Sequence, residues 1–147
     1  EQTLDFIDRL YLVKFRKTIS MQKQKQKFSL RKRLKSFVFA FAGLKILQKE
    51  EHNFRIHLVA AILVIAAGFI FKISSYDWIA IILTIGFVFV VEIFNTAIEN
   101  ITNFISPDEN SSIKRIKDMS AAAVLISAIV AVIIGLMVFL PELFALI

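Results

Sequence analysis

The sequence predicts an all-α integral membrane protein, and three observations lead to that prediction. The chain has 147 residues and is 57% hydrophobic, which is more apolar surface than a soluble domain of this size easily buries. Three long apolar runs cover about residues 56–73, 78–98 and 121–140, and a helix needs about 20 residues to cross a bilayer. Glycine occurs four times and proline twice, so few residues interrupt helices. We expect an N-terminal interfacial amphipathic helix followed by three transmembrane helices.

Residues 1–28 form a basic N-terminal extension to which we assign no fold. Met21 is followed by a polar, basic string, and a natural start at Met21 would make residues 1–20 extra upstream sequence. The extension has no long apolar stretch, so it is not a signal peptide. We treat residues 29–147 as the membrane domain.

The segment 29–50 has the pattern of an amphipathic helix. Apolar residues recur at spacings of three and four, with Lys and Arg between them. These apolar residues are Leu30, Leu34, Phe37, Phe41, Leu44 and Leu47. A basic amphipathic helix beside membrane spans usually lies in the headgroup region. An ordinary helix on a soluble core is the alternative, but no soluble core follows.

The positive charge is concentrated at the N-terminus, where residues 1–55 hold fourteen of the eighteen Lys and Arg residues. Such a segment can bind nucleic acid, but beside membrane spans it marks the cytoplasmic side. The N-terminus and a polar loop over 100–118 are therefore expected in the cytoplasm, and the turn at 72–77 outside. We expect no nucleic acid partner. Three spans enclose little space by themselves, so we expect an oligomer with sites between protomers.

The second apolar run contains costly polar residues. Glu92, Asn95 and Glu99 are spaced at i, i+3 and i+7, so they share one helix face. A charge at the middle of a bilayer costs about 2.5–3.5 kcal/mol on insertion scales, and Glu92 lies about 12 Å from the expected cytoplasmic end of the segment at Asn100. These residues could simply bond helices together. Two like charges suit that purpose poorly without a cation, so we favour a functional role.

Further charged residues suggest a reaction class. Acidic residues on separate helices hold hard cations such as Mg²⁺, and Lys and Arg neutralise phosphate oxygens. Glu50 and Glu51 precede the first span, and Lys117 and Asp118 precede the third. Phosphoryl transfer from a nucleotide needs these groups. The sequence has no glycine-rich phosphate loop, and the absence of cysteine excludes disulfides and thiolate metal sites.

Two strings resemble the prokaryotic diacylglycerol kinase family, which includes undecaprenol kinases. They are EIFNTAIEN at 92–100 and KDMSAAAVLISAIVAV at 117–132, and the resemblance covers about Arg31 to Leu140. It implies a homotrimer of three-span protomers in the bacterial inner membrane. It also implies transfer of the γ-phosphate of ATP, with Mg²⁺, to a lipid alcohol at the cytoplasmic face.

The resemblance assigns roles to individual residues. It places the general base on Glu92, a positioning amide on Asn95 and the metal-holding carboxylates on Glu51 and Glu99. The implied nucleotide contacts are Lys32, Phe39, Asp108, Glu109, Asn110, Lys117 and Asp118. The implied lipid contacts are Gly43, Asn53, Phe54, Arg55 and Ala121. Three positions depart from the family pattern, with Lys32 in place of arginine, Phe39 in place of tyrosine and Ala121 in place of serine.

Three functions are compatible with the sequence. The first is a diacylglycerol kinase that produces phosphatidic acid. The second is an undecaprenol kinase that produces undecaprenyl phosphate, and the strings KEEHNFRIH and AAGFIFKISSYDW resemble this branch somewhat more. The third is a non-enzymatic three-span scaffold or channel, which leaves the joint presence of Glu51, the Glu92 face and the Lys117–Asp118 pair unexplained.

Overall fold

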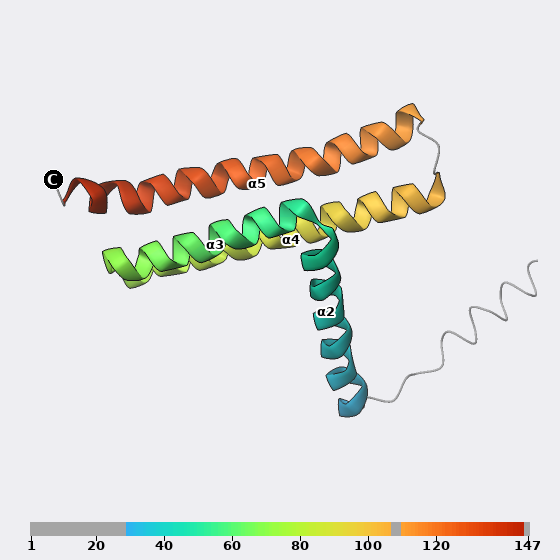
Figure 1. Cartoon of the computed structure of the whole chain (residues 1–147), viewed down its shortest axis with the longest axis horizontal. Coiled ribbons are helices and arrows are strands. Elements are labelled where there is room, and N and C mark those ends of the chain that lie inside the picture. The colour runs from blue at the N-terminus through green and yellow to red at the C-terminus, as the bar shows by residue number, and fades with distance from the viewer. Residues whose placement is uncertain (1–28, 107–109, 146–147) are drawn as a thin grey trace, which may run out of the picture. The chain divides into compact units, whose positions relative to one another are not determined.

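The computed structural model describes residues 29–106 and 110–145, which form helices and no strand. The extension 1–28 and two expected nucleotide contacts, Asp108 and Glu109, lie outside the described residues. Figure 1 shows the four helices, which are α2 (Leu30–Glu50), α3 (His52–Phe71), α4 (Ser75–Ile105) and α5 (Ser111–Phe144). The prediction of an all-helical chain is confirmed.

The chain divides into two parts that meet within α2, between Ala40 and Phe41. The described residues of the first part form the beginning of α2, and their side chains are exposed from Leu30 onward. The predicted helix over 29–50 is confirmed, and its location in the headgroup region stays a prediction.

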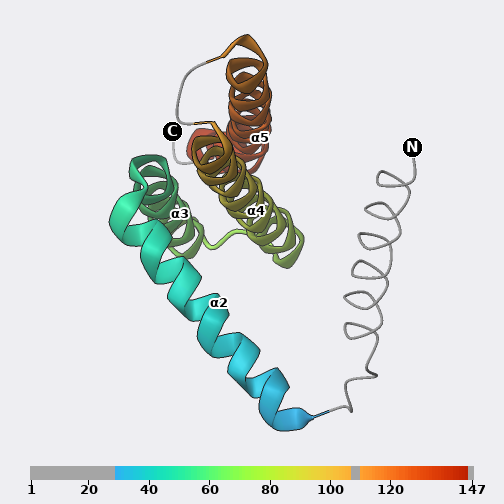
Figure 2. The same ribbon diagram turned by 90° about the vertical axis from the view of Figure 1, so that its right-hand side faces the viewer.

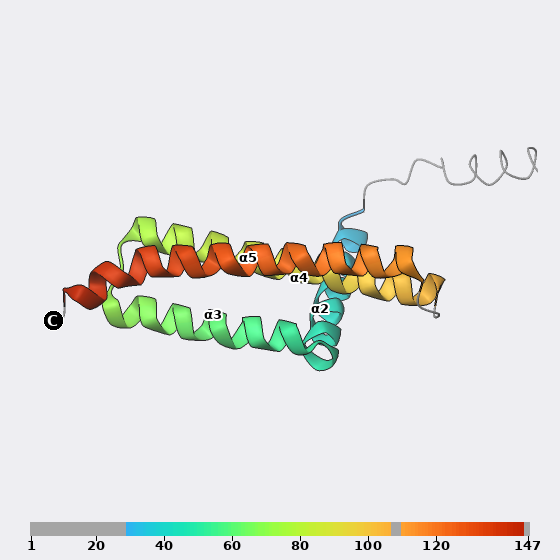
Figure 3. The same ribbon diagram turned by 90° about the horizontal axis from the view of Figure 1, so that it is seen from above.

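In the second part, α3, α4 and α5 run side by side (Figures 1 and 3), and α4 lies between the other two (Figure 2). All three are long and apolar enough to cross a membrane. Their large apolar side chains mostly face outward, as Phe69, Ile82 and Met137 do. In water such a surface would drive aggregation, whereas lipid chains solvate it without cost. The three predicted spans are confirmed.

The helices are longer than the apolar runs that predicted them. α4 continues to Ile105, and α5 begins at Ser111, so the prediction of a polar loop over 100–118 is wrong. The side chain of Asn110 caps α5, because its Oδ1 accepts a hydrogen bond from the Ile113 N–H at 2.9 Å. An apolar run shows where a helix meets lipid, and capping residues decide where the helix ends.

The connection between α3 and α4 is a turn of three residues. Lys72 adopts the left-handed conformation with φ 53°, and its N–H donates to the carbonyl of Gly68. Ser74 and Asp77 form a reciprocal capping box at the start of α4. The hydrogen bonds that stabilise this turn therefore come from the turn and from the helix ends beside it.

A small apolar core lies at this end of the bundle. Ile73, Ile81 and Val138 are buried there, and the ring of Trp78 packs against them. Gly68 leaves room for that ring, because a Cβ at this position would lie 2.9 Å from two of its carbon atoms. The ring centres of Trp78 and Phe69 are 4.8 Å apart.

Gly68→Ala is expected to destabilise the protein, because the added methyl group overlaps the Trp78 ring. Overpacking of this kind costs about 1–3 kcal/mol. Gly86→Ala is the matched control, since a Cβ there meets nothing within 4 Å. Thermal unfolding in detergent should show a lower midpoint for Gly68→Ala and an unchanged or higher one for Gly86→Ala. Equal midpoints for the two variants would contradict the packing described.

Candidate active site

One face of α4 buries four polar residues, whereas among the described residues α5 buries two, Ser120 and Ser127, and α3 buries none. Its buried polar residues are Glu92, Asn95, Thr96 and Thr102. Glu92 is 1% exposed, so protein atoms enclose its carboxyl group. The sequence predicted that Glu92, Asn95 and Glu99 share a helix face, and a hydrogen bond joins the last two.

That hydrogen bond orients one carboxylate of the face. Asn95 Nδ2 donates to Glu99 Oε1 at 3.0 Å. One turn further on, the hydroxyl of Thr102 donates to the carbonyls of Ile98 and Glu99, both at 2.9 Å. The side chains of this part of α4 are therefore held by neighbours on the same helix.

Two oxygens on this face remain without a partner. Glu92 Oε2 and Asn95 Oδ1 are buried and form no hydrogen bond with any described residue. A buried acceptor without a donor costs about 1–3 kcal/mol. Such a cost is typical of a site whose missing partner is a ligand.

Glu51 approaches this face from the break between α2 and α3. α3 has 20 residues, and 20 residues of the antiparallel α4 run from Ser75 to Phe94. The start of α3 therefore lies beside the stretch of α4 that holds Glu92. Consistent with this, the carboxylates of Glu51 and Glu99 both interact electrostatically with that of Glu92.

The break between α2 and α3 positions Glu51. This residue adopts an extended conformation, and its carboxylate forms no capping hydrogen bond, so it stays available for a ligand. Arg55 spans the break, with Nη1 donating to the carbonyl of Lys49 at 3.2 Å and Nη2 lying 3.3 Å from His52 Nδ1. The buried ring of Phe54 anchors the same junction against Phe89, at 5.2 Å between ring centres.

The acceptor set suits a hard divalent cation such as Mg²⁺. It consists of carboxylate and amide oxygens, two of which lack a donor. Within residues 29–106 and 110–145, no three acidic or histidine side chains are already arranged as a metal-binding group. The residues therefore fit a metal that arrives with further ligands, such as nucleotide phosphates and water.

The remaining expected residues are distributed over α2, α3 and α5. Lys117 is half-buried and Asp118 exposed in the second turn of α5, and among described residues no hydrogen bond or ion pair joins them to the α4 face. Asn110 is engaged as the α5 cap. The other exposed or half-buried positions are Lys32, Phe39, Gly43, Asn53 and Ala121. Lys32 and Phe39 belong to the first part of the chain.

The sequence did not predict the contacts that support this site. Phe89 reads as one more apolar residue of a span, and its contact with Phe54 depends on how α3 and α4 align. Arg55 was expected to contact lipid, and the structure shows it bonded across the helix break. No sequence pattern marks either contact.

One family model and several known proteins match this chain over most of its length. A family model described as prokaryotic diacylglycerol kinase matches residues 38–139. The chain is 37% identical over 123 residues to undecaprenol kinase of Bacillus subtilis (strain 168). This match covers 84% of this chain and 100% of that protein. It is 34% identical over 114 residues to diacylglycerol kinase of Synechocystis sp., covering 77% and 65% of the two chains. It is 33% identical over 100 residues to diacylglycerol kinase of Escherichia coli (strain K12), covering 68% and 82%.

Glu92→Leu is expected to raise stability, because it replaces a buried acceptor without a partner by a side chain that needs none. The gain should be about 1–3 kcal/mol. Glu99→Leu serves as the control, since it removes the acceptor of the Asn95 hydrogen bond and leaves a buried amide unpaired. Thermal unfolding of both variants measures the difference. A loss of stability in Glu92→Leu as large as in Glu99→Leu would show that Glu92 is satisfied in the folded protein.

Proposed function

The chain belongs to the prokaryotic diacylglycerol kinase family, and from this membership we propose that it phosphorylates undecaprenol with ATP. The family makes the chain a membrane lipid kinase. The undecaprenol kinase relative is matched over its whole length, whereas the diacylglycerol kinase relatives are matched in part. This favours undecaprenol over diacylglycerol, which reverses the order expected from the sequence. Diacylglycerol remains the second candidate.

One observation carries the catalytic assignment, and it is the buried carboxylate of Glu92, whose Oε2 has no hydrogen-bond partner among the described residues. As general base it would accept the proton of the lipid hydroxyl. The lipid oxygen would then form a bond to the γ-phosphorus, the bond from that phosphorus to the β–γ bridging oxygen would break, and ADP would leave. A positioned base of this kind contributes about 10²–10⁴-fold to the rate.

Glu51 and Glu99 are proposed to hold Mg²⁺, which when bound supplies positive charge to the ATP phosphates. Asn95 would keep Glu99 oriented through their hydrogen bond. Lys117 would neutralise phosphate oxygens, and Asp118 with residues 108–110 would contact the rest of the nucleotide. Gly43, Asn53 and Ala121 would lie beside the lipid.

The assembly and the orientation are also proposals. We propose a homotrimer, because three spans enclose little space by themselves and the opposite side of α4 stays exposed at Phe87, Val90 and Phe94. The basic N-terminal region and the connection between α4 and α5 would face the cytoplasm, by the positive-inside rule. ATP would then reach Glu99 and Lys117 from the same side.

Purified protein in lipid is expected to phosphorylate undecaprenol with a kcat/KM at least about tenfold above that for diacylglycerol. Transfer of labelled phosphate from ATP to each lipid measures both constants.

Glu92→Gln should reduce kcat about 100-fold or more with either lipid. Near-normal turnover in that variant would refute the base assignment, and higher efficiency with diacylglycerol would reverse the substrate assignment.

Glu99→Gln is expected to raise the Mg²⁺ concentration needed for half-maximal activity, by about tenfold or more. The reason is that it replaces a charged oxygen ligand by a neutral amide. Glu50→Gln is the matched control, because Glu50 is an exposed acid next to Glu51. A magnesium titration of activity should separate the two variants, and an unchanged midpoint in Glu99→Gln would rule out its role in holding the metal.

A further inference from the structure

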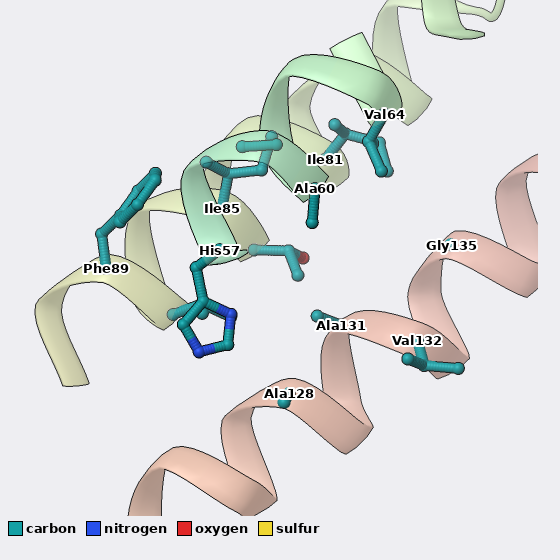
Figure 4. A pocket seen from close by; sticks show the side chains of 13 residues that line it. His57, Ala60, Val64, Ile81, Ile85, Phe89, Ala128, Ala131, Val132 and Gly135 are labelled. Carbon is teal, nitrogen blue, oxygen red and sulfur yellow. The ribbon is translucent and has the colours of Figure 1, made fainter. Parts of the chain in front are cut away.

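The three spanning helices line an apolar, partly open cavity of about 270 Å³. Figure 4 shows it between α3, α4 and α5, with Val64, Ile81 and Gly135 at one end and His57, Phe89 and Ala128 at the other. Small residues of α5 leave the space open, since Ala128, Ala131 and Gly135 line it. From His57 to Val64 the cavity follows α3 for two turns, about 10 Å.

The cavity continues the candidate catalytic face. Its α4 lining ends at Val88 and Phe89, and Glu92 follows one turn later on the same side of the helix. Glu92 is 1% exposed, so a lipid hydroxyl can reach it only through space between the helices. The cavity is such a space, and it begins about one helical turn from the carboxylate.

The polarity of the cavity matches a lipid alcohol. The hydroxyl of Thr84 donates its proton to the carbonyl of Ala80 at 2.7 Å, so His57 is the side chain of the lining that still offers a hydrogen-bond donor. His57 lies at the end nearer to Glu92, and the other end is apolar. A molecule with one polar end and a hydrocarbon chain therefore fits in one direction, with its head toward Glu92.

The volume of the cavity suits part of one hydrocarbon chain. An apolar cavity of about 150 Å³ holds a benzene ring, so 270 Å³ accommodates the first segment of a hydrocarbon chain. We propose that this cavity binds the chain of the substrate lipid alcohol and directs its hydroxyl to Glu92. The proposal rests on the proposed lipid kinase function and adds the residues that recognise the chain, chiefly Ala131 and Gly135.

Filling the cavity tests the proposal. Ala131→Phe should raise KM for the long-chain lipid alcohol about tenfold, with KM for ATP and for a short-chain analogue unchanged. Ile129→Phe places the same ring at a similar depth on the exposed side of α5 and should change none of them. Gly135→Leu is a second variant, because a Cβ at Gly135 meets nothing within 4 Å, and it should also raise the long-chain KM. Equal long-chain KM values in wild type, Ala131→Phe and Gly135→Leu would overturn the proposal.

A binding experiment separates this inference from the kinase function. A long-chain alcohol with a diazirine near the middle of its chain is photolysed in vesicles containing the wild-type protein, and labelled peptides are mapped by mass spectrometry. Labelling of the cavity lining on α3 and α5 that Ala131→Phe removes supports the site, even if no phosphoryl transfer is seen. Labelling confined to the outer, lipid-facing residues overturns it, even if the protein is an active kinase.

Discussion

The absence of water in the bilayer interior is the constraint on which this structure depends. Backbone N–H and C=O groups must form their hydrogen bonds within each segment, so the spanning parts are helices. The same constraint makes a polar side chain costly unless something pairs with it. Among the residues that the structure describes, Glu92 and Asn95 each keep a buried oxygen without a hydrogen-bond partner, so the protein gives up stability at that point of α4. A substrate hydroxyl and a cation are the partners that would recover it.

The contacts around the site hold Glu51 and Glu99 near Glu92, although the like charges of these carboxylates repel one another. Arg55 fixes the break between α2 and α3, and Phe54 packs that break against α4. Asn95 holds Glu99 from within α4. Glu51, at the break before α3, and Glu99, on α4, are therefore positioned by different neighbours before any cation arrives. Electrostatic preorganisation of this kind is usually the largest contribution to catalysis.

Much of the fold could be predicted from the sequence, because the bilayer leaves few alternatives. Three apolar runs predicted three helices, and periodicity placed Glu92, Asn95 and Glu99 on one face. The extension of α4 to Ile105 could not be predicted, since polar residues outside a bilayer form helix or loop according to their caps. The roles of Phe54 and Arg55 could not be predicted either. Both depend on distances between segments, which a sequence pattern does not contain.

The closed turn between α3 and α4 has a consequence for how the protein enters its membrane. Lys72 and the Ser74–Asp77 box satisfy the turn without help from other segments, so α3 and α4 can insert together as a hairpin before α5 is made. In that case both ends of the hairpin stay on the side from which it entered. The charged residues at the tip of the hairpin that must then cross the bilayer are Lys72 and Asp77. Asp77 Oδ2 already accepts hydrogen bonds from the Ser74 N–H and hydroxyl. Glu51, Glu92 and Glu99 then stay in the half of each segment that faces the side of entry, and none of these carboxylates has to cross the whole hydrocarbon layer.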